Sequence, residues 1–373
     1  MNILIITPGY PNKDRSDYSF VKQVVDQLAL IGHNCCVISP YSITHNHKTY
    51  RFKETERITE NSSITILRPN YLSFSNIKLF GINISDSLYK MAVDFATKFV
   101  PFKPDVVYCH FWRSGHAIYK YAIKLGIPLF VASGESKIPD EESQKKYEKY
   151  HKYVRGVICV STKIKDECRS MGLIGEEKLT IIPNAINSKV FYLRDKQKCR
   201  STLDIPEDAF VCIFVGWFSE RKGVRRVAKA INSIDGKAVY SIFIGGEDNL
   251  ECQNILFKGK VSHEKIPIYL NAADVFVLPT LHEGCCNAII EAMACGLPVI
   301  SSNLSFNWDI LNETNSLLVD PMNICQIADS IIKLRDNNKL RMQLSLGALQ
   351  TAKGLTIDVR VNKIMDYILK RTK

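Results

Sequence analysis

Two carboxylates, Glu283 and Glu291, lie eight residues apart in the most densely patterned stretch of the chain. In an α-helix this spacing corresponds to about two turns, which places both side chains near one face. Carboxylate oxygens that face a common cavity accept hydrogen bonds from hydroxyl groups, so the pair suits the recognition of a sugar. Taken alone, the pair equally suits a charge at a helix N-terminus followed by a solvated helix residue.

The segment around these carboxylates, residues 279–298, reads PTLHEGCCNAIIEAMACGLP and directly follows the apolar run DVFVL. This order predicts a buried strand, a turn and then a helix. A helix placed in this way points its first backbone N–H groups out of the end of a sheet, where they can bind phosphate. The segment therefore predicts a site for a phosphorylated ligand with hydroxyl groups.

The elements that must position this site alternate between short apolar runs and amphipathic stretches. Apolar runs without polar alternation predict strands buried on both faces, as in parallel sheets. The expected strands are 2–6, 35–39, 105–109, 128–132, 157–160 and 179–182, then 210–215, 239–244, 254–257, 274–278, 298–301 and 316–319. The expected helices are 19–31, 85–99, 114–125, 223–234, 264–272, 286–295, 323–350 and 356–371.

This β-α-β series predicts an α/β fold of two doubly wound domains, in which ligands bind at the carboxyl ends of the strands. The polar stretch YLRDKQKCRS after PNAINSKVF indicates a linker near the domain boundary. We expect a first domain at 1–190, a second at 191–355, and a terminal helix within 356–373. A ligand would then lie in the cleft between the domains.

The composition, with 46% hydrophobic and 23% charged residues among 373, excludes a disordered or fibrous chain. Met1 is followed at once by the apolar NILIIT, and no run of 18 apolar residues occurs, so we expect neither a secretion signal nor a membrane span. The 12 cysteines include no C-x-x-C spacing and mostly lie in apolar patterns. A reducing, cytoplasmic location is therefore expected.

The net charge of +11 is concentrated in the first 190 residues, which carry +8. A basic domain attracts phosphates, but no basic and aromatic recognition run is present, which argues against nucleic acid as a partner. Residues 71–104 are rich in aromatics and lysines. They favour a core-facing helix from Ser85 to Phe99. The other interpretations are an amphipathic surface for a lipid-linked acceptor, with peripheral contact of the basic domain with an anionic membrane, and a solvated surface without a partner.

The stretch Pro279–Pro298 resembles the hallmark of the retaining GT-B glycosyltransferases of family 4, the glycosyl transferases group 1. That hallmark reads E-G-x-x-x-x-x-x-E-A-M-A-x-G-x-P, and every named letter is present, including Gly284 after Glu283. The likeness covers nearly the whole chain, through TPGYP, DVVYCHFW, CVSTKIKDEC, LTIIPNAINSKVF and VGWFSERKGV. Together these motifs are far more specific than any one of them.

The resemblance implies a UDP- or GDP-linked sugar donor held by the second domain and transferred without a metal or another cofactor. On this mapping Glu291 binds the ribose hydroxyls and Glu283 binds the sugar hydroxyls. Lys222 neutralises the leaving diphosphate, which a fixed cation can do without magnesium. The remaining donor-binding residues are expected to be Gly284, Cys285, Cys286 and Asn287 at the helix end, with Ser19 in the first loop.

In the first domain, His110 ends an expected strand and matches a histidine of the family, so it is assigned to the catalytic residues. The terminal helix at 356–373 is expected to return to this domain, as in similar GT-B proteins.

Three positions depart from the family pattern. Trp217 replaces the arginine after V-G, Tyr18 and Ser19 replace glycine in the first loop, and Glu135 replaces a histidine in VASGES. Each lies where phosphate or acceptor chemistry is expected. We expect Arg221, next to Lys222, to supply the missing charge, with Arg225 as the other candidate.

The predicted function is transfer of a sugar to a glycan or lipid-linked acceptor in bacterial surface polysaccharide synthesis, on the inner face of the membrane. The alternative is a catalytically impaired GT-B scaffold or binding protein that lost the arginine. A sugar-nucleotide epimerase is disfavoured by E-x7-E joined to A-M-A-x-G-x-P. A dehydrogenase is disfavoured because no G-x-G-x-x-G follows a strand.

Overall fold

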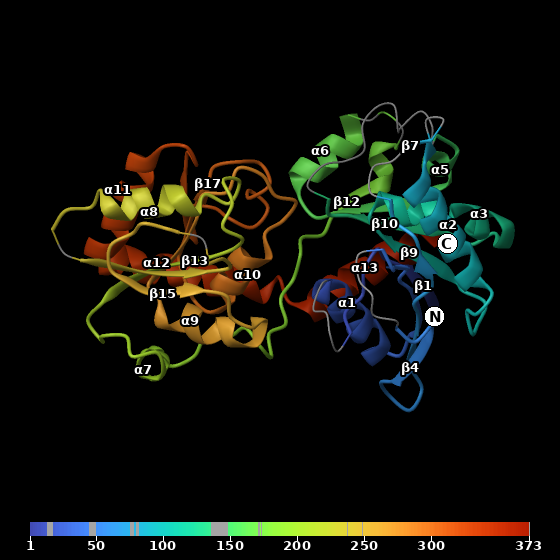
Figure 1. The fold of residues 1–373 in the computed structure, drawn as a ribbon, viewed down its shortest axis with the longest axis horizontal. Helices are drawn as coiled ribbons and strands as arrows, with labels where there is room; N and C mark the ends of the chain where they lie inside the picture. The colour runs from blue at the N-terminus through green and yellow to red at the C-terminus, as the bar shows by residue number, and fades with distance from the viewer. Residues whose placement is uncertain are drawn as a thin grey trace. The chain divides into compact units, whose positions relative to one another are not determined.

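The computed structural model describes residues 1–12, 18–44, 50–74, 78–79, 82–135, 148–170, 172, 174–236, 238–247 and 249–372. These residues form two compact units (Figure 1). The first comprises Met1–Val160, Ile164–Ile182 and Val361–Lys373, and the second comprises Ser161–Lys163 and Pro183–Arg360. The last helix, α13 (Ile357–Thr372), therefore begins in the second unit and continues in the first.

The first unit is built on a sheet whose described strands follow the order β12-β11-β10-β9-β1-β2-β5-β4. Neighbouring strands pair in parallel except β4, which is antiparallel at the edge. Its strands are β1 (Asn2–Ile6), β2 (Asn34–Ile38), β4 (Lys53–Arg57), β5 (Ser63–Leu67), β9 (Val106–His110), β10 (Leu129–Ser133), β11 (Gly156–Cys159) and β12 (Leu179–Ile181). The central strands β9 and β10 are buried throughout, as expected for a parallel sheet covered on both faces.

The helices of this unit follow the strands in alternation. They are α1 (Ser19–Leu30), α2 (Ile84–Thr97), α3 (Trp112–Leu125), α5 (Glu148–Tyr153), α6 (Thr162–Ser170) and the short η1 (Glu176–Lys178). Two short ribbons add β3 (Tyr41–Ser42), β6 (Asn70–Tyr71), β7 (Lys78–Leu79) and β8 (Ile82–Asn83). The helix predicted at 85–99 is confirmed as α2, which Asn83 caps by accepting a hydrogen bond from the backbone N–H of Asp86.

The second unit contains a parallel sheet with the described order β15-β14-β13-β16-β17-β18. Its strands are β13 (Phe210–Val215), β14 (Val239–Ile244), β15 (Ile255–Gly259), β16 (Val275–Leu278), β17 (Val299–Ser302) and β18 (Ser316–Val319). Figure 1 shows α8 (Val224–Asn232) and α11 (Ile324–Asp336) on one side of this sheet and α9 (Ile266–Ala272) on the other. The predicted α/β class with parallel sheets is confirmed in both units.

The remaining helices among the described residues are α7 (Lys196–Thr202), η2 (His263–Lys265), α10 (Asn287–Ala294), α12 (Asn338–Lys353) and α13 (Ile357–Thr372). The single helix predicted at 323–350 is wrong, because the chain breaks at Asn337, whose side chain caps α12 by accepting from the N–H of Leu340 at 2.9 Å. The polar stretch interpreted as a linker contains α7, which Asp195 caps in the same manner.

The chain crosses from the first unit to the second at Ile182–Pro183, ahead of the predicted boundary at 190. The residues that follow are already bound to the second unit. Arg360 donates to the carbonyl of Pro183 and to Oδ1 of Asn184, the latter at 3.0 Å, and Ile186 bridges to Thr356. The chain therefore enters and leaves the second unit at neighbouring positions.

Candidate active site

Glu283 lies in the loop after β16 and is the centre of a charged cluster in the second unit. Its Oε1 accepts hydrogen bonds from Lys222 Nζ at 2.6 Å, Arg221 Nη1 at 2.8 Å and Thr280 Oγ1 at 2.8 Å. The side chains of Glu283 and Lys222 are only 12% and 11% exposed. Among the described residues no donor contacts Oε2 of Glu283, so this oxygen is available to a ligand.

Two loops are fastened together to build this cluster. The two cations belong to the loop between β13 and α8, and the carboxylate belongs to the loop between β16 and α10. The N–H of Leu281 donates to the carbonyl of Arg221 at 2.8 Å, and the Arg221 side chain donates to the carbonyl of His282. Gly223 adopts a φ of +83°, and a Cβ there would lie 2.7 Å from the carbonyl oxygen of Pro279. Glycine is therefore required at this junction.

Lys222 retains its positive charge although its side chain is nearly buried. Burial is the largest influence on its pKa and lowers it, but attraction to Cys286 and Glu283 and the hydrogen bond to Glu283 outweigh burial, so the pKa is raised. One N–H group of the ammonium points to Glu283, and Nζ lies 3.9 Å from the Cys286 sulfur. Since an ammonium has three N–H groups, at least one remains for an anionic ligand.

The N-terminus of α10 adjoins the cluster. Gly284, Cys285 and Cys286 are buried immediately before the helix, and the carbonyl of Cys285 accepts a hydrogen bond from Asn184 at 3.1 Å. Oδ1 of Asn287 is buried and has no hydrogen-bond partner within the described part of the chain. A buried acceptor without a donor destabilises the protein, and a ligand hydroxyl placed here would remove that cost.

Glu291, farther along α10, contacts a histidine that the sequence reasoning missed. His263 Nε2 lies 2.9 Å from Glu291 Oε1. Spacing could not reveal this pair, because 28 residues separate the two in the chain. The available signal was that VSHE follows an expected strand, where side chains reach the carboxyl edge of the sheet.

Trp217, which replaces the family's arginine, lies in the loop after β13 with 73% of its surface exposed. The neighbouring Gly216 is pressed against Gly245, since a Cβ on Gly245 would lie 2.2 Å from the carbonyl oxygen of Gly216. The loops after β13 and β14 therefore meet here without side chains between them. The arginine that contacts Glu283 is Arg221, and the exposed Trp217 occupies the position of the family's arginine.

In the first unit, the structure gathers aromatic rings around His110, the buried last residue of β9. The ring centroids of Phe20 and Phe111 lie 6.1 Å and 6.5 Å from that of His110. Ser19 begins α1 beside Tyr18, whose ring lies 6.2 Å from Phe111 and whose φ is +62°. His110 and Ser19 therefore lie at one edge of this sheet, whereas the two glutamates and Lys222 belong to the second unit.

Glu135, the third departure, caps a helix. Its Oε1 accepts from the backbone N–H of Trp112, the first residue of α3, at 2.7 Å, and its Oε2 accepts from Ser133 Oγ at 3.0 Å. Burial raises the pKa of this carboxyl, and these hydrogen bonds oppose the rise. Because both oxygens are occupied, the acid in this position acts on the stability of the α3 N-terminus.

Two family models match the chain and together span both units. The model "Glycosyltransferase Family 4" matches residues 19–190, and "Glycosyl transferases group 1" matches residues 195–350. The chain belongs to this family of glycosyltransferases. The predicted family is therefore confirmed.

Curated relatives of this glycosyltransferase resemble it over most of its length. A putative teichuronic acid biosynthesis glycosyltransferase, TuaC of Bacillus subtilis, is 25% identical over 354 residues, which cover 89% of each chain. A UDP-Gal:alpha-D-GlcNAc-diphosphoundecaprenol alpha-1,3-galactosyltransferase of Escherichia coli is 25% identical over 72% of this chain and 76% of the relative.

Solved structures confirm the GT-B fold. A sucrose-phosphate synthase from Thermosynechococcus elongatus superposes with a TM-score of 0.77 at 18% identity, covering 99% of this chain and 98% of the other. Anabaena HepE in complex with UDP-glucose gives a TM-score of 0.72 at 15% identity, covering 99% and 100%. At these identities the likeness concerns the fold.

Within the described residues, no group of three or more His, Cys, Asp or Glu side chains could hold a metal ion. In the same part of the chain, no helix combines the length and apolar character needed to cross a membrane.

Proposed function

We propose that this glycosyltransferase moves a sugar from a nucleotide-sugar donor to a glycan or lipid-linked acceptor in bacterial polysaccharide synthesis, with retention of configuration. The observation that carries the proposal is the cluster of Lys222 and Arg221 around Glu283, where two cations adjoin a carboxylate with one open oxygen. Relatives named for teichuronic acid, lipopolysaccharide core and capsular polysaccharide biosynthesis support this acceptor class. The UDP-Gal in the name of the E. coli relative supports a nucleotide-sugar donor.

Each group of the donor has a proposed partner in the second unit. Lys222 and Arg221 neutralise the diphosphate as it leaves, with the backbone amides of Cys285, Cys286 and Asn287 and the buried Gly284 beside it. Oε2 of Glu283 accepts from a sugar hydroxyl, and Oε2 of Glu291 accepts from the ribose. Fixed positive charge and a helix N-terminus stabilise developing negative charge, so this scheme requires no metal ion or other cofactor.

In the proposed reaction the acceptor hydroxyl attacks the anomeric carbon from the face that the diphosphate leaves. The bond from that carbon to the phosphate oxygen breaks as the bond to the acceptor oxygen forms. The acceptor's proton passes to the departing phosphate oxygen. In the first unit, His110 is proposed to contact the reacting sugars and Ser19 the donor phosphate.

Turnover of UDP-, GDP- and ADP-sugars by the full chain tests this function. We expect hydrolysis or transfer with a UDP- or GDP-sugar, lowered turnover in Glu283→Gln and weaker nucleotide binding in Glu291→Gln. A wild type inactive with every donor would contradict the proposal. If Trp217→Arg alone then gained activity, the catalytically impaired scaffold would be the better description.

We also propose that α2 provides peripheral contact with an anionic membrane. Met91 and Phe95 lie one turn apart on α2, Phe99 follows just beyond the helix end, and the three are 65%, 49% and 40% exposed. Lys98 lies over the Phe95 ring, with its ammonium 6.0 Å from the ring centroid. Exposed aromatics beside lysines suit an interface of apolar chains and anionic headgroups.

Flotation with anionic and neutral vesicles tests this contact. Phe95→Ser should reduce recovery with anionic vesicles, and higher salt should reduce wild-type recovery, because exposed charges are screened. Leu346→Ser, which changes a residue of α12 that is 66% exposed, is the matched control and should behave as wild type. Equal recovery of wild type and Phe95→Ser would contradict the proposal.

A further inference from the structure

His263 occupies a defined position beside the proposed donor site. It begins η2, the turn that follows β15, and its Nε2 meets Oε1 of Glu291 at 2.9 Å. The Glu291 side chain is 11% exposed, whereas that of His263 is 45% exposed. The pair therefore joins a nearly buried carboxylate to an imidazole that solvent protons can reach.

The pair leaves one side of the carboxylate open. His263 takes Oε1 of Glu291, and among the described residues no hydrogen bond reaches Oε2. The ring of Phe191, itself 2% exposed, packs edge-on against His263 with the centroids 5.1 Å apart. Because packing on one side and a hydrogen bond on the other fix the imidazole, it in turn fixes the rotation of the carboxylate.

We propose that His263 is a positioning residue for donor binding, which holds Glu291 through Oε1 so that Oε2 faces the hydroxyls of the nucleotide ribose. This inference rests on the proposed donor-binding role of Glu291. It adds a residue from a different loop to that role and makes the affinity for the nucleotide depend on pH.

The charges around His263 give the direction of that dependence. The charged groups that face it are Glu291 from α10 and Glu264 from its own turn, and Phe191 brings no charge. The hydrogen bond to Glu291 is the largest effect and raises the pKa of His263, burial opposes it, and attraction to both glutamates adds to the rise. A protonated His263 makes a charge-assisted hydrogen bond, which is stronger than a neutral one. Nucleotide affinity should therefore fall as pH rises through this pKa.

Binding of UDP, GDP and ADP, measured by calorimetry between pH 6 and 8.5, tests the inference without turnover. For the nucleotide that binds most tightly, His263→Ala should weaken binding about tenfold at pH 6 and remove most of its pH dependence. His263→Gln, which keeps an N–H donor, should recover part of the affinity without the pH dependence. In turnover assays both changes should raise the donor KM and leave kcat within about twofold.

Controls separate this inference from the proposed function. Lys265→Ala, an exposed change in the same turn, should bind like wild type at every pH. If Glu291→Gln weakens binding while His263→Ala and His263→Gln do not, the positioning role is wrong and the donor site stands. If Glu291→Gln binds as wild type, or if no nucleotide binds the wild type, the donor assignment fails and the inference fails with it.

Discussion

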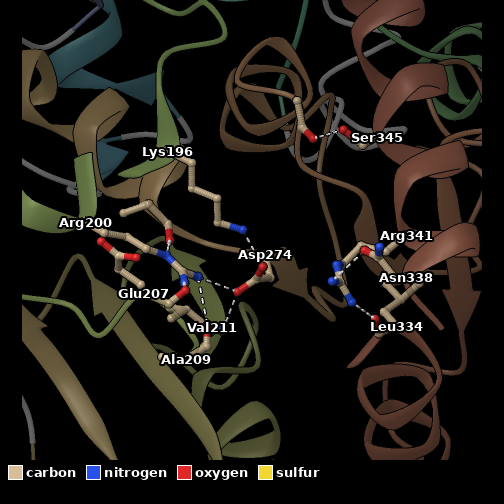
Figure 2. A network of polar contacts seen from close by, with 12 residues as sticks. Lys196, Arg200, Glu207, Ala209, Val211, Asp274, Leu334, Asn338, Arg341 and Ser345 are labelled. Atoms are coloured by element: carbon tan, nitrogen blue, oxygen red, sulfur yellow. Dashed lines mark hydrogen bonds and ion pairs between the residues drawn. The ribbon is translucent and has the colours of Figure 1, made fainter. Parts of the chain in front are cut away.

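Strand β16 of the second unit has a charged cluster at each end, and the two clusters differ in how completely their hydrogen bonds are satisfied. At the amino end, Asp274 accepts from Arg200 at 2.8 Å and from the N–H of Val211 at 2.7 Å with one oxygen, and binds Lys196 with the other (Figure 2). At the carboxyl end, three donors share one oxygen of Glu283, and the other oxygen is open.

The buried cations of the two clusters, Arg200 and Lys222, also differ in how much hydrogen-bonding capacity they have left. Arg200 is 3% exposed and also donates to the carbonyls of Ala272, Glu207 and Ala209, so little of its capacity remains. Lys222 keeps at least one N–H group for a ligand. Both clusters contain buried opposite charges, and burial alone would not distinguish them. Unused hydrogen-bonding capacity marks the end where a ligand can bind.

The largest expected effect comes from breaking the cluster around Asp274, in which both carboxylate oxygens already have partners. Asp274→Asn leaves Arg200 buried without its counter-charge and should lower the free energy of unfolding by about 3 to 5 kcal/mol. Urea denaturation measures this loss. Glu283→Gln, the matched change at the other end, also removes the counter-charge of a buried cation, but Lys222 can lose its proton whereas Arg200 cannot, so it should lower stability less than Asp274→Asn while lowering turnover. Equal stability of the two variants would refute the distinction.

Removing the cation with open capacity should act on the reaction. Lys222→Ala should lower turnover about 100-fold to 1000-fold, because one preorganised group that stabilises the leaving diphosphate is lost. Lys196→Ala removes a lysine that is likewise paired with a carboxylate and should leave turnover unchanged. Initial rates at saturating donor provide the comparison, and similar rates for both variants would count against the assignment of Lys222.

Arg221 should contribute less, since its side chain is 44% exposed. Arg221→Ala should lower turnover about tenfold, equivalent to about 1.4 kcal/mol of transition-state stabilisation. Trp217→Arg added to this variant should restore part of the rate if the two positions supply the same charge. Single-turnover rates measure both effects. An Arg221→Ala variant with the wild-type rate would show that the charge comes from elsewhere.

Glu135 extends the comparison to the first unit with the smallest expected effect. Both of its oxygens are occupied, so it should behave as Asp274 does and act on stability. Because its folded-state pKa is raised, wild-type stability should fall as pH rises through the window between the unfolded and folded pKa values. Glu135→Gln should remove that fall without changing turnover. Urea denaturation at pH 5 and pH 8 measures it, and a large loss of turnover would instead indicate contact with substrate.

Much of the fold was predictable, because strands of a parallel sheet are apolar on both faces and so differ from their surroundings in the sequence. β13, β14 and β18 have the predicted bounds. The strands β4 and β5 were not predicted. β4, with the sequence KETER, is an exposed edge strand whose polar residues resemble a loop. The break at Asn337 was missed although the five polar residues RDNNK at 335–339 interrupt the apolar pattern there.

The site was predictable in part for a different reason. Glu283, Lys222 and Arg221 could be proposed from motifs, since each motif spans a strand end and the loop that follows it. His263 and the capping role of Glu135 depend on contacts between separate loops, and local spacing does not encode those contacts. That both oxygens of Asp274 are already hydrogen-bonded could not be foreseen either, since its partners come from α7 and β13.

The adjacent crossings at Pro183 and Arg360 have a consequence for recombining such enzymes. Apart from Ser161–Lys163, the second unit is one uninterrupted piece of chain whose two ends are tied together, as in a domain inserted into a host. Residues 183–360 can therefore be exchanged as a cassette with the equivalent piece of a relative, with both junctions at one point. Such chimaeras would test by direct transplantation whether donor preference follows the cassette and acceptor preference the host.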